Sequence, residues 1–162
     1  MGATSVRPPE ADAYEHEYPG ASWLANRVLR ELEDVGGMAQ ALVATVARRH
    51  GLSHAALNAL AVLEGNGGPL AAGELGARMH ITSGTMTSVL DTLEGKGYIR
   101  RHADPTDRRR VLVDLTPTAQ AVLDRLLPEV QQAVTAVMGT LDDQALHELL
   151  HQLTVVREAL AA

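Results

Sequence analysis

The chain has 162 residues, of which 46% are hydrophobic, and its formal net charge is −6. Its apolar residues are aliphatic, with no Phe and one Trp, a composition that suits one or two small helical domains. It has no cysteine, which excludes disulfides, thiolate metal sites and cysteine redox sensing. No apolar run is long enough for a signal peptide or a membrane span, so we expect a cytoplasmic protein with no membrane partner.

The charge is unevenly distributed along the chain. Residues 78–110 contain seven Arg or Lys and four Asp or Glu, so this segment carries +3 and the remaining residues carry −9. A basic segment on an acidic chain is compatible with local binding to a polyanion such as DNA.

The first fifty residues contain a tail and two helical patterns. Residues 1–20 are rich in Pro, Gly, Ala and acids and show no apolar period, which predicts a mobile tail. Ser22 can cap a helix that starts at Trp23 and continues at helical spacing. We expect the Gly-Gly pair at 36–37 to interrupt this helix and a second helix to end at Arg49.

Three shorter helical patterns follow. Ser53 can cap the first, which should stop at the glycine-rich turn of residues 65–69. A short helix over residues 71–79 comes next. Thr82 then opens another helix, which should run to about Lys96.

The hydrophobic period changes at Tyr98. Residues 98–102 and 111–115 read as two strands, and Asp and Pro residues between them favour a turn. Two short helices followed by a hairpin are typical of a helix-turn-helix with a wing.

Two further helices complete the pattern. Thr116 and Pro117 are suited to the cap and first position of a helix that runs to about Met138, and Pro128 should kink or divide it. Asp142 can cap the last helix. The long aliphatic helices at both ends of the chain have surplus apolar stripes, which favours an intersubunit bundle.

The predicted fold is mainly α with a small β-hairpin wing. It consists of a winged helix-turn-helix and a helical dimerisation region. The expected parts are a mobile tail (1–20), N-terminal dimerisation helices (21–51), the winged helix-turn-helix (52–116) and C-terminal dimerisation helices (117–162).

From about Leu52 to Leu127 the chain resembles the MarR (multiple antibiotic resistance regulator) family of winged-helix repressors. LSHAALNALAVL resembles that family's helix before the helix-turn-helix, LAAGELGARMHITSGTMTSVLDTLEGKGYIRR its support and recognition helices, and DPTDRRRVLVDLT its wing. The resemblance implies a transcriptional regulator, a repressor rather than an enzyme. It would bind double-stranded DNA as a homodimer on a pseudo-palindromic operator and be released by a small-molecule effector.

The residues at the start of the expected recognition helix support DNA binding independently. They are short, polar and uncharged, and they can reach phosphates or base edges beside the helix N-terminal amides. These candidates are Thr82, Ser83, Thr85, Thr87 and Ser88. The alternative is an ordinary solvated helix face.

The wing carries three consecutive arginines, Arg108, Arg109 and Arg110. Like charges side by side repel one another unless an anion is near, which favours a DNA-contacting wing over a solvated hairpin. The resemblance implies that Arg109 enters the minor groove, oriented by Asp107. We expect Arg108 or Arg110 to contact the flanking phosphates. Arg100 and Arg101 are expected to contact phosphates or to pair with Asp104.

The effector site is less defined by the sequence. By analogy with the family, an apolar or aromatic ligand would enter a cleft between the dimer helices and the winged domain. Trp23 and His50 are its candidate lining residues. We expect no cofactor.

Residues 146–153, LHELLHQL, contain the order His-Glu-x-x-His, which on a helix can bind zinc with the glutamate as general base. His147 and His151 lie opposite the leucine stripe of their helix, and a third ligand is not evident. We therefore interpret the motif as an accident of helix composition and expect no metal site. The alternatives are a zinc-responsive helical protein that uses His147 and His151, or a small hydrolase with Glu148.

Overall fold

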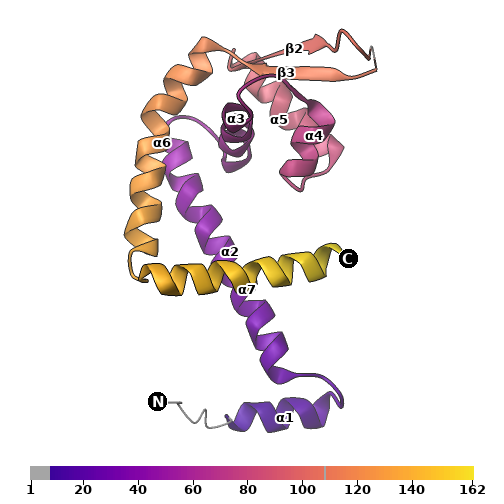
Figure 1. The fold of residues 1–162 in the computed structure, drawn as a ribbon, viewed down its shortest axis with the longest axis vertical. Helices are drawn as coiled ribbons and strands as arrows, with labels where there is room; N and C mark the ends of the chain where they lie inside the picture. The colour runs from indigo at the N-terminus through magenta and orange to yellow at the C-terminus, as the bar shows by residue number, and fades with distance from the viewer. Residues whose placement is uncertain (1–7, 108) are drawn as a thin grey trace. The chain divides into compact units, whose positions relative to one another are not determined.

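The computed structural model describes residues 8–107 and 109–162, which contain seven helices and three strands (Figure 1). The chain falls into two compact units, Met1–Ala41 and Leu42–Ala162. Helix α2, Trp23–Arg49, passes through the boundary between them. None of the helices in the described ranges is long and apolar enough to cross a membrane.

The first unit contains helix α1, Pro9–Glu17, which corrects the expected tail over residues 1–20. Pro9 suits the first helical position, because its fixed φ matches the helix and the N–H that it lacks would have no partner there. Glu10 and Asp12 place negative charge at the positive end of the helix dipole. These end signals favour a helix even though the segment has no apolar period.

Helix α2 is continuous over 27 residues, so the predicted interruption at Gly36 and Gly37 was wrong. An interior glycine disfavours a helix by about 1 kcal/mol relative to alanine. The leucines, alanines, Met and Gln on either side are good helix formers and offset this penalty. A Cβ built on either glycine would meet nothing within 4 Å, so close packing does not require them.

The second unit contains three shorter helices, and two of them begin at capping residues visible in the sequence. The three helices are α3 (His54–Asn66), α4 (Ala72–Arg78) and α5 (Ser83–Gly95). The Ser53 Oγ accepts a hydrogen bond from the Ala56 N–H at 3.1 Å, and Gly67 ends α3 with a φ of +69°. The Thr82 Oγ1 accepts from the Thr85 N–H at 3.3 Å and caps α5, as predicted.

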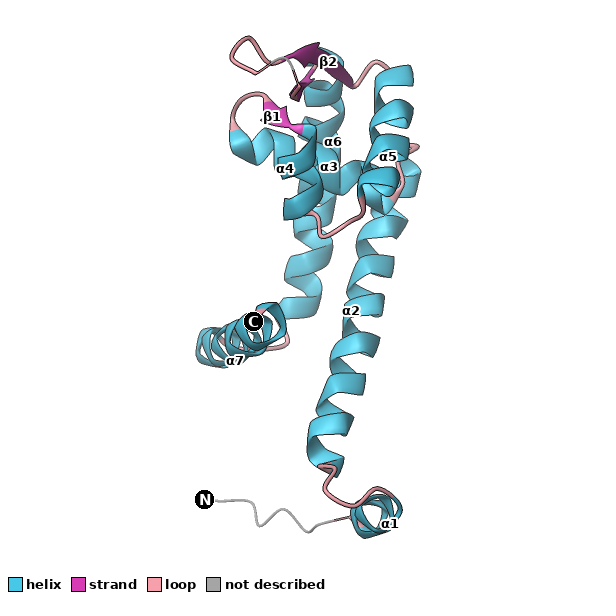
Figure 2. Cartoon of the chain, turned by 90° about the vertical axis from the view of Figure 1, so that its right-hand side faces the viewer, coloured by secondary structure: helices cyan, strands magenta, loops and turns pink. Residues whose placement is uncertain are grey.

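The second unit also contains an antiparallel sheet, whose strands are drawn in magenta in Figure 2. The strands are β1 (Leu70–Ala71), β2 (Ile99–Ala103) and β3 (Val111–Leu115). The strand order is β1-β3-β2. Val113 lies opposite Leu70 on one side and opposite Arg101 on the other. The hairpin of β2 and β3 was predicted. Strand β1 was not, because two residues are too few to show an alternating pattern.

Two long helices follow the sheet, α6 (Pro117–Met138) and α7 (Asp143–Ala161). The expected caps are present: the Thr116 Oγ1 accepts from the Ala119 N–H at 3.2 Å, and the Asp142 Oδ1 accepts from the Ala145 N–H at 2.8 Å. Pro128 lies inside α6 and does not divide it. A proline removes one hydrogen bond from the ladder, and the apolar face of α6 remains buried on the core.

One apolar core lies under the sheet and between α3, α4, α5 and the first turns of α6. Its largest fully buried side chains are Leu60, Leu63, Leu75, Leu93, Ile99, Val113, Leu123 and Leu126. This arrangement confirms the predicted fold class, a mainly α protein with a winged helix-turn-helix. Helix α7, by contrast, has no buried residue in the single chain.

Candidate nucleic-acid interface

The N-terminal turns of α5 present short polar side chains on one side and bury apolar ones on the other. The predicted residues Thr82, Ser83, Thr85, Thr87 and Ser88 are all exposed. Met86, Leu90 and Leu93 face the core and fix the helix from behind. The exposed turn therefore has the polarity and the small side chains that allow a helix to approach nucleic acid closely.

The hydroxyls of this surface bond to their own helix in the free protein. The Thr87 Oγ1 donates to the Ser83 carbonyl at 2.9 Å, and the Ser88 Oγ donates to the Gly84 carbonyl at 3.3 Å. Hydroxyls rotate easily, so each can exchange this bond for one to a phosphate or a base edge. The first turn adds backbone N–H groups and the positive end of the helix dipole.

The turn of the wing is built on Asp104, which is only 7% exposed. Its Oδ1 accepts from the Thr106 hydroxyl at 2.6 Å, the Thr106 N–H at 2.8 Å and the Asp107 N–H at 3.4 Å. These bonds, the Thr106 hydroxyl bond first, lower the pKa of Asp104, with a smaller contribution from Arg110. The carboxylate stays ionised at neutral pH and holds the turn closed.

Arg109 projects from this turn with 91% of its side chain exposed. Its Nε lies 3.2 Å and its Nη2 3.4 Å from the two carboxylate oxygens of Asp107, whose Oδ1 also accepts from the Arg109 N–H at 3.0 Å. The hydrogen bond from the Arg109 side chain is the main reason why the pKa of Asp107 is lowered. The contact expected between Asp107 and Arg109 is present. Arg108, the first arginine of the predicted run, lies outside the described residues.

The partners of the other arginines differ from the expected ones. Arg101 contacts two carboxylates of α5, with its Nη2 2.6 Å from Asp91 Oδ1 and its Nε 3.5 Å from Glu94 Oε2. Arg100 lies 3.9 Å from Asp114 on the neighbouring strand. Of the two roles expected for these arginines, pairing with Asp104 was wrong, because their acidic partners lie on α5 and β3. The other role, contact with phosphate, stays a prediction.

Arg110 takes the place beside Asp104, with its Nε 3.8 Å from the Asp104 Oδ2. Its Nη2 lies 3.0 Å from the Oε2 of Glu74 in the first turn of α4. Asp104 was predicted as a partner of other arginines, and the Asp-Pro-Thr order at 104–106 gave its turn signal. Glu74 was not predicted, because no local signal points to it.

The sequence and the fold of this chain resemble those of known proteins. A protein-family model described as the MarR family matches residues 50–110. The HTH-type transcriptional regulator YcgE of Bacillus subtilis is 44% identical over 62 residues, which span 38% of this chain and 40% of that relative. A MarR family transcriptional regulator from Silicibacter pomeroyi, of known crystal structure, is 30% identical, with 77% of this chain and 84% of that chain covered and a TM-score of 0.66. This chain belongs to the MarR family.

A further MarR family structure is that of the transcriptional regulator Sco3205 from Streptomyces coelicolor, crystallised in complex with DNA. It is 25% identical, with 85% of this chain and 88% of that chain covered and a TM-score of 0.77.

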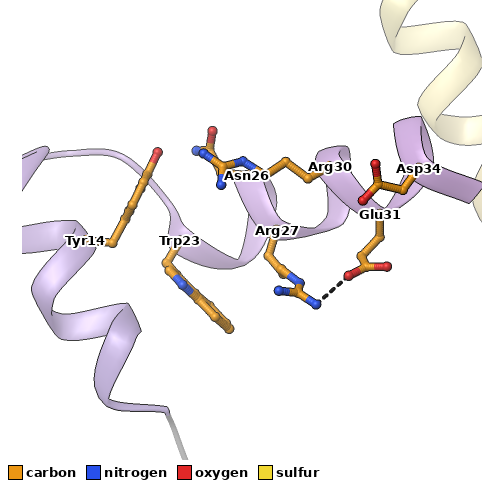
Figure 3. Close-up of a pocket in the computed structure, with 7 residues that line it drawn as sticks. All are labelled: Tyr14, Trp23, Asn26, Arg27, Arg30, Glu31 and Asp34. Carbon is orange, nitrogen blue, oxygen red and sulfur yellow. Dashed lines mark ion pairs between the residues drawn. The ribbon is translucent and has the colours of Figure 1, made fainter.

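The two residues predicted to line an effector site lie in different units of this MarR family chain. Trp23 lines a pocket of about 350 Å³ in the first unit, together with Tyr14, Asn26, Arg27, Arg30, Glu31 and Asp34 (Figure 3). Arg27 and Glu31 form an ion pair at its edge. His50 is in the second unit, where its Nε2 lies 2.9 Å from Glu129 Oε1. Both residues therefore have polar neighbours, and the effector site stays a prediction.

The His-Glu-x-x-His segment lies on α7 with its three polar residues exposed. The His147 Nδ1 donates to the Asp143 carbonyl at 2.6 Å, and Glu148 accepts from the Gln152 side chain at 2.7 Å. The described residues contain no group of three or more His, Asp or Glu side chains placed to hold a metal ion.

Proposed function

We propose that this protein is a sequence-specific DNA-binding transcriptional regulator and not an enzyme. The observation that carries the proposal is the pairing, within one unit, of an exposed polar recognition-helix start with a wing that projects Arg109 almost fully into solvent. Membership of the MarR family supports it, as does the DNA complex of the similar Sco3205. A regulator of this kind represses when its site overlaps a promoter, because the bound protein excludes the polymerase.

The protein would bind as a homodimer. Helix α7 buries nothing in the single chain and exposes a stripe of large apolar side chains, namely Leu149, Leu150, Leu153, Val156 and Leu160. Soluble proteins cover stripes of this kind, and a second copy of the chain would do so with two-fold symmetry. Two recognition helices related by a two-fold axis would read a pseudo-palindromic operator.

Duplex titration tests the DNA-binding proposal. A duplex selected by the protein from a randomised pool (the selected duplex) should bind more tightly than one of shuffled sequence (the shuffled duplex). Fluorescence anisotropy at several salt concentrations should show affinity that falls as salt rises, because phosphate contacts release counterions. A metal chelator should leave the affinity for the selected duplex unchanged. A loss of affinity on chelation would instead favour the zinc-responsive protein that uses His147 and His151. Equal, salt-insensitive binding of both duplexes would contradict the proposal.

We also propose that a small aromatic molecule acts as effector through the pocket at Trp23. The indole supplies an apolar face, and Arg27 and Arg30 supply donors for polar groups of the ligand. Trp23 is the single tryptophan, so its emission reports binding directly. In a panel of phenolic compounds, those that shift the emission should also weaken binding to the selected duplex. Compounds that shift the emission but leave DNA affinity at its starting value would exclude this pocket as the effector site.

A further inference from the structure

Arg110, at the base of the wing, is held by a carboxylate from a different element of the fold. Its Nη2 lies 3.0 Å from Glu74 Oε2, although 36 residues separate the two in sequence. Its Nε lies 3.8 Å from the carboxylate of Asp104, inside the turn of the wing. One arginine therefore connects the first turn of α4 to the wing through two acidic residues.

This connection lies beside the exposed arginine. Glu74, Arg109 and Arg110 line one hollow of about 400 Å³ between the start of α4 and the wing. Arg109 contacts Asp107, a residue of its own turn, so that contact does not tie it to α4. The position of Arg109 relative to α4 and α5 thus depends on how firmly its neighbour Arg110 is held.

We propose that Glu74 is a positioning residue for DNA binding, an inference that rests on the proposed function. The ion pair with Glu74 keeps Arg110 away from phosphates and restrains the wing relative to α4. Arg109 is thereby held in a defined position for contact with DNA. This role replaces the phosphate contact that the sequence suggested for Arg110. The Glu74 carboxylate also repels phosphates directly, which limits the affinity for DNA of any sequence.

The ion pair is weak enough to be changed without unfolding the protein. The side chains of Arg110 and Glu74 are 48% and 54% exposed, so solvent and salt screen their attraction. The buried partner, Asp104, bonds to Thr106 within its own turn, so a change at Glu74 should leave these bonds in place. A melting curve close to that of the parent protein should accompany each substitution at position 74.

The decisive substitution is Glu74→Gln. It frees Arg110 for phosphate and removes one negative charge, so the affinity for the shuffled duplex should rise roughly two- to fivefold for each bound protomer. The salt slope should steepen by about one for each protomer. The selected duplex should gain less, because the loosened wing presents Arg109 less well. The ratio of the two affinities should therefore fall.

Two controls separate positioning from charge alone. Glu33→Gln removes an exposed acid of α2, so it changes the net charge equally but should keep the parent ratio. The double variant Glu74→Gln with Arg110→Gln removes both partners of the ion pair at the parent net charge. Because it leaves no freed arginine for phosphate, its salt slope should return to that of the parent, while the ratio stays low. If Glu74→Gln keeps the parent affinities and slope, or if the double variant keeps the steeper slope of Glu74→Gln, the inference is wrong. If the parent itself binds no duplex, the proposed function fails instead.

Discussion

Leu153→Asp should convert the protein from a stable dimer to monomers that are folded poorly or not at all. Leu153 is 39% exposed in the single chain and belongs to the apolar stripe of α7. If a second copy covers this stripe, the substitution removes about 1.5–3 kcal/mol of apolar burial from each protomer. It also places a carboxylate in an apolar seam, which disfavours association further. The dimer should weaken by at least about a hundredfold.

Sedimentation velocity at micromolar concentration and thermal melting measure this effect. His151→Asp is the matched control, because it introduces the same charge two residues away on the opposite, exposed face of α7. It should sediment and melt like the parent protein. A Leu153→Asp variant that remains a dimer, or a parent protein that is a stable folded monomer, would rule out α7 as the dimer contact.

The features that the sequence predicted well depend on hydrogen bonds between near neighbours. Ser53, Thr82, Thr116 and Asp142 were each expected to cap a helix, and each accepts a hydrogen bond from the N–H three residues later. A cap of this kind is formed within four residues, so the local sequence contains all its parts. The same holds for the contact between Asp107 and Arg109 in the wing.

The features that the sequence did not predict are of two kinds. Some depend on a balance between opposing conformational preferences, and others depend on contacts between residues far apart in the sequence. Whether the glycines at 36–37 break α2 depends on a balance between their penalty and the propensity of a 27-residue helix, which no single residue reveals. Strand β1 exists because its two residues meet β3, more than 40 positions away. Glu74 and Arg110 likewise meet only in the folded unit. The arginine run was visible in the sequence, but the sequence did not show which arginine forms an ion pair with a carboxylate of α4.

Arg109→Ala should weaken binding to the selected duplex by about 1–3 kcal/mol for each protomer and relax the preference at the base steps that Arg109 touches. In the free protein Arg109 is paired with Asp107, but its side chain is 91% exposed. Solvent screens an exposed ion pair of this kind, so it yields readily to a stronger partner. A narrow minor groove is such a partner, because it concentrates negative potential around an inserted guanidinium.

Asp107 should assist this exchange rather than oppose it. Its pKa is lowered, first by the Arg109 side chain, so the carboxylate is ionised at neutral pH and holds the guanidinium at the edge of the turn. Asp107→Asn should therefore retain most of the binding energy but lose part of the base preference, because the arginine keeps its charge and loses its orientation. Titration of both duplexes separates these two effects.

The choice of comparison variants decides what a loss of affinity means. Arg109→Lys keeps the charge but not the planar fork, so it should keep the salt slope and lose discrimination between the duplexes. Arg125→Ala removes an exposed arginine from α6 and changes the net charge as Arg109→Ala does. It should bind both duplexes nearly as the parent does. If Arg109→Ala weakens both duplexes equally and only as much as Arg125→Ala, the wing contributes net charge alone. A larger loss confined to the selected duplex is what insertion into the minor groove requires.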